Sequence, residues 1–380
     1  MIVHAHPGWK GSIVWRVAKR SLLPVNRRFS VTALFALGVA IVACSGADAR
    51  PDSTAATPLR IGPAPMAAQL DSARLATVFE TAADMPRLRS MIVQWKGDIV
   101  GERYYGRATR ATRHNIKSAS KSVMSALVGI AIAQGKITGV GQPIRELLVA
   151  ETRGLDSTKR SITVGDLLSM RAGLQTTSFD NYGAWVTSRN WVQYALRQPI
   201  VAQPGNGSPM IYSTGSTHLL SAILTRATGM NTYRYAERYL ARPLGISLRP
   251  WQTDPQGIYF GGNDMYLTSR DMLKIGALYL NRGRVGDRQV IDSAWIDSSW
   301  VMRTSSPWNG NRYGYGWWTR YAHGHDVRFA WGYGGQFIFV VPTLELVVVM
   351  TSDAESRREG DHNRALHRLL EDQIIPSVLQ

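Results

Sequence analysis

Strand-forming segments lie near both ends of this chain, and helix-forming segments fill the sequence between them. Two apolar runs, at 90–95 and 99–105, flank a Lys-Gly-Asp turn and predict a β-hairpin. Two β-branched runs, at 337–341 and 345–351, are joined by a Pro-containing turn and predict a second hairpin. We therefore expect an α+β fold. One antiparallel sheet is built from both chain ends and carries flanking helices, with a mainly helical region inserted.

The spacing of apolar residues predicts where the helices lie. The first helix is expected at 70–81, and the chain should close with an amphipathic helix at 363–378. Further helices are predicted at 163–170, 219–228, 233–240, 269–280 and 293–301. These elements divide the folded part into a sheet region, residues 67–117 and 306–380, and a mainly helical region, residues 118–305. The active site is expected between the two.

The first 43 residues have the pattern of a lipoprotein signal peptide. A basic segment precedes an uncharged run at 29–43, and no Asp or Glu occurs before Cys44, the only cysteine. Ile41-Val42-Ala43-Cys44 resembles the lipobox of bacterial lipoproteins, which implies cleavage before Cys44 and lipidation of its sulfur. The alternative is an ordinary secretory peptide cleaved after Ala49, with Cys44 discarded.

The lipoprotein interpretation predicts an exported protein anchored to a bacterial envelope membrane. Ser45 follows Cys44, which by resemblance to lipoprotein sorting signals favours the outer membrane, and residues 44–66 have the composition of a linker. The formal net charge of +17 suits anionic surroundings such as phospholipid headgroups. Because the basic residues are scattered and form no nucleic-acid motif, no nucleic-acid partner is expected.

A stretch from Asn115 to Ile132 begins polar and is almost wholly apolar from Val123 onward. It predicts a buried helix entered at Ser118. Residues three apart share a helix face, so Ser118 and Lys121 should meet at the start of this helix. A hydroxyl beside an amine suits a serine nucleophile with a lysine partner. Taken alone, the pair is more often a helix cap and a solvated lysine.

Two downstream stretches give this pair a chemical context. Tyr212 lies on a loop before a helix, where its phenol could relay protons with Lys121, provided that a nearby ammonium stabilises the phenolate. Residues 331–336 (Trp-Gly-Tyr-Gly-Gly-Gln) stand directly before a strand. Their glycines would let backbone approach a ligand, so that an N–H there could join the Ser118 N–H in an oxyanion hole. A simple bulge before the strand is the alternative.

The order and spacing of these motifs resemble the serine β-lactamase and penicillin-binding-protein superfamily, in its class C-like branch. Stretches 162–174 and 261–272 support the resemblance, which covers roughly residues 70–375. Within the superfamily the motifs are more similar to esterases and 6-aminohexanoate-oligomer hydrolases than to antibiotic hydrolases. The resemblance implies a nucleophile, its proton acceptor, a second general acid/base and a backbone N–H of the oxyanion hole: Ser118, Lys121, Tyr212 and Tyr333.

Two departures from the family pattern bear on the substrate. Thr214 stands where the family often has Asn, so an amide that could bind substrate or orient Lys121 is missing. Trp331 stands where β-lactamases have a Lys that helps hold the β-lactam carboxylate, and a Trp favours an apolar or neutral substrate. In this alignment Trp331-Gly332-Tyr333 fills the place of the family's Lys-Thr-Gly triplet. If the alignment is shifted by two residues, Tyr333-Gly334-Gly335 fills that place and a Lys is again absent. Weak or no β-lactamase activity is therefore expected. The candidate substrate-binding residues are Thr214, Trp331, Gly332 and Gly334.

The predicted function is a serine hydrolase that cleaves ester or amide bonds through an acyl-enzyme. Its substrate is expected to be a small-molecule or peptide ester or amide. The eight His form no metal pattern, and no metal or organic cofactor is expected. Two alternatives stay open. A D-amino-acid peptidase or carboxypeptidase acting on cell-wall peptides would use the same chemistry, and a non-catalytic envelope lipoprotein would keep the fold for binding, as Thr214 would allow.

Overall fold

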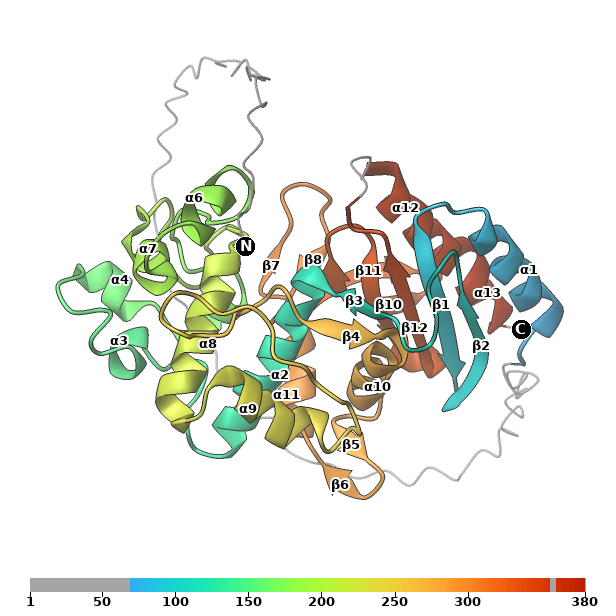
Figure 1. Ribbon diagram of the computed structural model, residues 1–380, viewed down its shortest axis with the longest axis horizontal. Helices are drawn as coiled ribbons and strands as arrows, with labels where there is room; N and C mark the ends of the chain where they lie inside the picture. The colour runs from blue at the N-terminus through green and yellow to red at the C-terminus, as the bar shows by residue number, and fades with distance from the viewer. Residues whose placement is uncertain (1–68, 356–359, 380) are drawn as a thin grey trace, which may run out of the picture. The chain divides into compact units, whose positions relative to one another are not determined.

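An eight-stranded antiparallel sheet combines strands from both ends of the chain, in the order β2-β1-β12-β11-β10-β9-β8-β7 (Figure 1). This confirms the predicted fold class. The N-terminal hairpin meets the C-terminal one where β1 pairs with β12, with Met91 opposite Met350. The strands are β1 (Leu88–Trp95), β2 (Asp98–Tyr104), β7 (Thr304–Ser305), β8 (Arg312–Tyr313), β9 (Trp318–Ala322), β10 (His325–Gly332), β11 (Gln336–Val341) and β12 (Leu346–Ser352).

The computed structural model describes residues 69–355 and 360–379. The predicted signal peptide, residues 1–43, and the whole predicted linker, residues 44–66 with Cys44, lie outside these residues. Within the part of the chain that is described, no helix is both long enough and apolar enough to cross a membrane.

The two predicted hairpins have turns that explain their register. Lys96 and Gly97 both have positive φ, 49° and 89°, as a two-residue turn between twisted strands requires. Between β11 and β12 a short 3₁₀ turn, Pro342–Leu344, is followed by Glu345 with φ 50°. Strand register then alternates the side chains between the two faces of the sheet.

Each face of the sheet has its own helical layer (Figure 1). Phe337, Phe339 and Val348 belong to a core shared with α1 (Ser72–Ala83) and with the C-terminal helices α12 (Gly360–Arg368) and α13 (Ile375–Ser377). Their strand neighbours, such as Ile338 and Val347, belong to the larger core with α2 (Ser120–Ala133) and α10 (Ser269–Leu280). The nucleophile helix α2 therefore packs between the sheet and the helical region.

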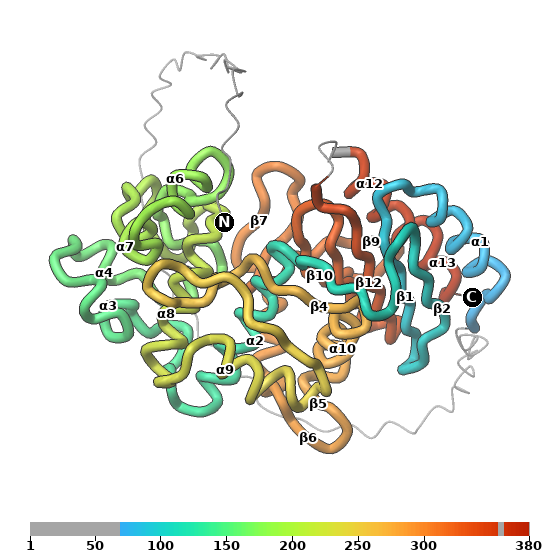
Figure 2. Tube along the Cα trace, in the orientation of Figure 1, coloured from blue at the N-terminus to red at the C-terminus, as the bar shows by residue number. Residues whose placement is uncertain are grey.

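The helical region carries shorter elements around the central helix α8 (Thr214–Thr228). They are α3 (Ile144–Leu147), α4 (Ser157–Ser161), α5 (Val164–Leu168), α6 (Tyr182–Val186), α7 (Trp191–Arg197), α9 (Thr232–Ala236) and α11 (Ser293–Trp300), with 3₁₀ or π turns at Lys117–Ala119, Phe179–Asn181, Glu237–Ala241 and Leu369–Ile374. Small strands are β3 (Arg113–Asn115), β4 (Tyr266–Thr268), β5 (Arg284–Val285) and β6 (Arg288–Gln289). Figure 2 follows the connection from α9 to β4, which pairs with β3.

Several helix boundaries differ from the sequence prediction; the helix predicted at 363–378, for example, is α12, a π turn and α13 in turn. Two of the differences lie near the site. Helix α8 begins at Thr214, five residues before the predicted 219, because its first turn is made of small polar residues that show no amphipathic period. Helix α5 ends at Leu168, and Met170 already has φ 60°, so the helix stops before Gly173. Both boundaries, the start of α8 and the end of α5, lie next to the segment that carries Tyr212.

Candidate active site

Ser118 lies in a tight turn between β3 and α2. Lys117 has φ 49°, a conformation that few residues with a side chain adopt, and its N–H donates to Asn115 Oδ1 at 2.9 Å. The Ser120 hydroxyl donates to the Lys117 carbonyl at 2.6 Å, which closes the turn before α2 starts. The half-buried Ser118 side chain is thus held by a strained backbone rather than lying on a regular helix.

Lys121 lies one turn further along and is buried, with 3% of its surface exposed. Its Nζ atom donates to Ser118 Oγ at 3.0 Å and to the Gly262 carbonyl at 2.8 Å. A third contact, to Thr214 Oγ1, measures 3.2 Å. Burial lowers the pKa of Lys121 from 10.5 to about 7. A large fraction of the amine is therefore neutral at physiological pH and can accept the Ser118 proton.

Tyr212 lies beside both Ser118 and Lys121. Its hydroxyl forms a hydrogen bond with Ser118, and Lys121 Nζ lies 5.1 Å from the centre of its ring. Burial raises the pKa of Tyr212 to about 12, and the Ser118 hydrogen bond only partly opposes this rise. The phenol thus stays protonated, which differs from the expectation of a phenolate stabilised by an ammonium. A protonated phenol has a proton that it can donate to a reacting group.

A run of three hydroxyl residues, 176–178, fixes the segment that carries Tyr212. The Thr176 hydroxyl donates to the Tyr212 carbonyl at 2.7 Å, and Thr177 Oγ1 lies 3.1 Å from Ser213 Oγ. Ser178 Oγ lies 3.0 Å from Thr214 Oγ1 and accepts the Thr214 N–H at 2.9 Å. Sequence reasoning missed this run. Three consecutive hydroxyl residues after a predicted helix were the available signal.

Gly262 is a second residue that sequence reasoning did not single out, although it lies in one of the supporting stretches. It has φ 91°, and an added Cβ would lie 2.8 Å from Lys121 Cγ and 2.3 Å from Thr217 Oγ1. Only glycine can bring its carbonyl this close to the lysine amine. The paired glycines at 261–262 were the signal that could have found it.

The glycine-containing stretch 331–335 begins with the last two residues of strand β10. A Cβ on Gly332 would lie 2.1 Å from the Ile116 carbonyl, so β10 touches the chain just before Ser118. This contact favours the register in which Trp331-Gly332-Tyr333 fills the family triplet. A Cβ on Gly334, which has φ 81°, would lie 2.6 Å from Ala354 Cα. The end of β10 at Gly332 therefore lies alongside the residues that directly precede Ser118.

Trp331 itself is used for packing beside the site. Its ring stacks on Phe337 at 6.2 Å with an interplanar angle of 4°, and it meets Trp318 at 5.7 Å. Trp318 in turn stacks on Tyr212 at 6.0 Å. Tyr212, Trp318, Trp331 and Phe337 therefore form an aromatic row. Thr214 is 5% exposed and directs its hydroxyl at Lys121.

The Beta-lactamase family model matches residues 75–372, and the chain belongs to this family. Among curated proteins, the 6-aminohexanoate-dimer hydrolase of Paenarthrobacter ureafaciens is 24% identical over 220 residues, covering 53% of this chain and 54% of that protein. The chain thus matches about half the length of this relative.

Two solved structures have the same fold. A putative 6-aminohexanoate-dimer hydrolase from Bacillus anthracis superposes with a TM-score of 0.66 at 19% identity, covering 78% of this chain and 80% of that one. EstCE1, a hydrolase with promiscuous acyltransferase activity, gives a TM-score of 0.65 at 18% identity over 81% of this chain and 98% of that one. At 19% and 18% identity, these two structures show the fold that the chain shares with them.

Proposed function

We propose that this protein is a serine hydrolase that cleaves ester or amide bonds through an acyl-enzyme on Ser118. One observation carries the proposal: a buried lysine, with a pKa lowered to about 7, lies 3.0 Å from a serine hydroxyl at a strained turn. A group whose pKa lies near the working pH is an efficient general base. Burying an ammonium is costly, so a buried lysine with a lowered pKa is more often found at a functional site.

Each residue then has one task. Lys121 removes the Ser118 proton as the hydroxyl oxygen attacks the substrate carbonyl carbon. The backbone N–H groups of Ser118 and Tyr333 stabilise the oxyanion that forms. Tyr212, protonated and hydrogen-bonded to Ser118, delivers a proton to the leaving group and regains one from Lys121. A water molecule attacks the acyl-enzyme in the reverse sequence of proton transfers and releases the acid.

The substrate class is inferred from the relatives and from the aromatic row. The two 6-aminohexanoate-dimer hydrolases favour an amide, and the hydrolase with acyltransferase activity favours an activated acyl donor such as an ester. Trp331, which replaces the lysine of β-lactamases, lies among aromatic rings and offers no cation for a β-lactam carboxylate. We therefore expect neutral esters and amides to react faster than penicillins.

Active-site labelling tests the proposal. A fluorophosphonate probe should label the purified protein covalently, and Ser118→Ala should abolish labelling together with hydrolysis of short-chain p-nitrophenyl esters. Ser122→Ala is the matched control, since it removes a buried hydroxyl of the same helix that donates to the Gly316 carbonyl at 2.6 Å. The proposal fails if the wild-type protein neither takes the label nor hydrolyses an ester, or if Ser118→Ala is labelled as fast as Ser122→Ala.

A further inference from the structure

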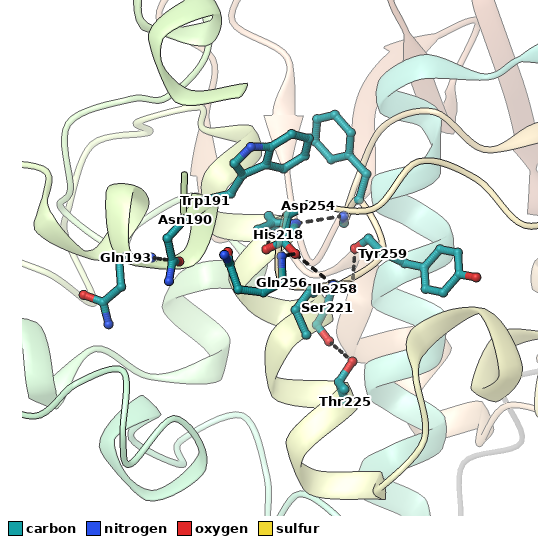
Figure 3. A network of polar contacts seen from close by, with 12 residues as sticks. Asn190, Trp191, Gln193, His218, Ser221, Thr225, Asp254, Gln256, Ile258 and Tyr259 are labelled. Carbon is teal, nitrogen blue, oxygen red and sulfur yellow. Dashed lines mark hydrogen bonds and ion pairs between the residues drawn. The ribbon is translucent and has the colours of Figure 1, made fainter. Parts of the chain in front are cut away.

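A histidine and an aspartate that the proposed mechanism does not use form a buried pair next to the site (Figure 3). His218 lies on α8, one turn after Thr214, and Asp254 lies on the connection between α9 and β4. His218 Nε2 is 3.1 Å from Asp254 Oδ2, and both side chains are 0% exposed. Two titratable groups are rarely buried so completely unless they fix something that the protein needs.

The surroundings of the imidazole determine its protonation state. Trp185, Trp191 and Phe260 lie around the ring at 5.8, 5.4 and 6.1 Å, and this burial lowers the pKa of His218 while Asp254 opposes the fall. The Gly261 N–H points at His218 Nδ1 from 3.4 Å, so Nδ1 is the acceptor. The proton therefore lies on Nε2 and is donated to Asp254.

Both oxygens of the Asp254 carboxylate are in use. Oδ2 accepts from His218, while Oδ1 accepts the backbone N–H groups of Gln256 and Ile258 at 2.9 and 2.8 Å (Figure 3). The Asp254 N–H also donates to the Ile258 carbonyl at 2.8 Å. The carboxylate thus shapes the turn 254–258 and joins it to helix α8.

The pair is connected to the catalytic lysine through two glycines. Gly261 lies so close to α8 that an added Cβ would be 2.1 Å from the Thr217 carbonyl, and its own carbonyl lies 2.8 Å from Thr217 Oγ1. The next residue, Gly262, presents its carbonyl to Lys121 Nζ at 2.8 Å. The position of this acceptor therefore depends on how Gly261 is held by His218 and Thr217.

We propose that His218 and Asp254 are positioning residues, which hold the Gly261–Gly262 backbone so that the Gly262 carbonyl orients Lys121 toward Ser118. This inference rests on the proposed hydrolase function. It assigns a role in catalysis to a pair that does not touch the reacting atoms. A small displacement of a group that orients a catalytic residue is expected to lower the rate by about 10- to 100-fold.

Asp254→Asn is the informative substitution, because an amide has one oxygen where the carboxylate uses two. If the amide oxygen keeps Gln256 and Ile258, its NH₂ group faces His218. The imidazole must then accept at Nε2 and hold its proton on Nδ1, opposite the Gly261 N–H. If the amide turns round, its NH₂ group instead meets the two backbone N–H groups of the turn. Either arrangement displaces Gly261.

Ser221→Ala is the matched control, because Ser221 joins the same helix to the same connection without touching Gly261. Its hydroxyl donates to the Tyr259 carbonyl at 2.6 Å and is fully buried (Figure 3). Three quantities are measured for each protein: the thermal midpoint, the fluorophosphonate labelling rate of Ser118 as a function of pH, and the His218 tautomer from long-range ¹H–¹⁵N NMR spectra.

We expect the Nε2–H tautomer in the wild type and its loss in Asp254→Asn. We also expect labelling of Asp254→Asn to be about 10- to 100-fold slower, with the acid limb moved to lower pH because the Lys121 ammonium loses an acceptor. Ser221→Ala should keep the wild-type labelling rate and pH profile. An Nδ1–H or charged His218 in the wild type would overturn the inference, as would equal labelling losses in both variants. Wild-type protein that neither takes the label nor hydrolyses an ester would instead refute the proposed function, while the tautomer still reports on the pair.

Discussion

Replacing Lys121 by Met should remove a specific pH dependence of stability as well as activity. The lysine is 3% exposed, and burial lowers its pKa from 10.5 to about 7. Between these two values the unfolded chain binds more protons than the folded protein, so the folded state becomes more stable as pH rises. Below about pH 7 the lysine is protonated in both states, and its full unfavourable contribution is present.

The size of this effect follows from the two pKa values. One unit of pKa difference corresponds to about 1.4 kcal/mol. With a folded-state pKa of about 7, raising the pH from about 7 to about 9 should stabilise the wild type by about 2 kcal/mol through Lys121 alone. Methionine does not titrate, so Lys121→Met should lack this increment. Other titrating groups contribute equally to both proteins and cancel in the comparison.

Urea unfolding followed by tryptophan fluorescence at the two pH values measures the increment. The change in free energy of unfolding between them should be about 2 kcal/mol larger in the wild type than in Lys121→Met. Lys136→Met, at an exposed position just after α2, should behave as the wild type. Equal pH slopes in wild type and Lys121→Met would show that Lys121 is not held in a neutral form, and would remove the basis for its role as a base.

Three further substitutions follow from the same geometry. Tyr212→Phe should keep the fold but slow acylation about 10²- to 10⁴-fold in stopped-flow ester hydrolysis, since it removes the proton donor; an unchanged rate would refute its role. Gly262→Ala should lose most labelling, because the new Cβ would lie 2.8 Å from Lys121 Cγ. Gly257→Ala is the control: Gly257 also has positive φ, but its added Cβ would meet no atom within 4 Å, so this variant should keep its labelling. We also propose that Cys44 carries a lipid anchor, so that Cys44→Ala should move the protein from the membrane to the soluble fraction on detergent-free fractionation; retention in the membrane would contradict this.

Local sequence patterns were sufficient to predict the hairpins and the long helices. The hairpin around Lys96-Gly97 and the helix Ser269–Leu280 have their signals within a few neighbouring residues: turn residues in the first, and a Thr268 cap with apolar spacing in the second. That both chain ends build one antiparallel sheet was also predicted, because an isolated two-stranded hairpin is marginally stable and needs further strands. The short strands β3 and β4 carry no such signal, because three residues are too few to show a period.

The site was predictable only as far as motif residues reach. Ser118, Lys121 and Tyr212 were found because spacing and residue type reveal them, and the structure brings all three together. Ser178 and Gly262 were not found, because their importance lies in contacts with residues far away in sequence. The protonation states were equally inaccessible. A lysine with a pKa near 7 beside a tyrosine with a pKa near 12 results from burial, which no local pattern measures.

The missing family asparagine can be understood from these contacts. In this protein the Thr214 hydroxyl lies 3.2 Å from Lys121 Nζ and 3.0 Å from Ser178 Oγ. The shorter Thr214 side chain therefore contacts the lysine amine and is itself held by the Ser178 hydroxyl. The Gly262 carbonyl supplies a further acceptor on the same amine. An amide would offer substrate an N–H donor, whereas Thr214 is 5% exposed and its hydroxyl is engaged with its neighbours. Thr214 therefore contacts the lysine through its hydroxyl and has no amide N–H to offer a substrate, which is consistent with the neutral acyl substrate that we propose.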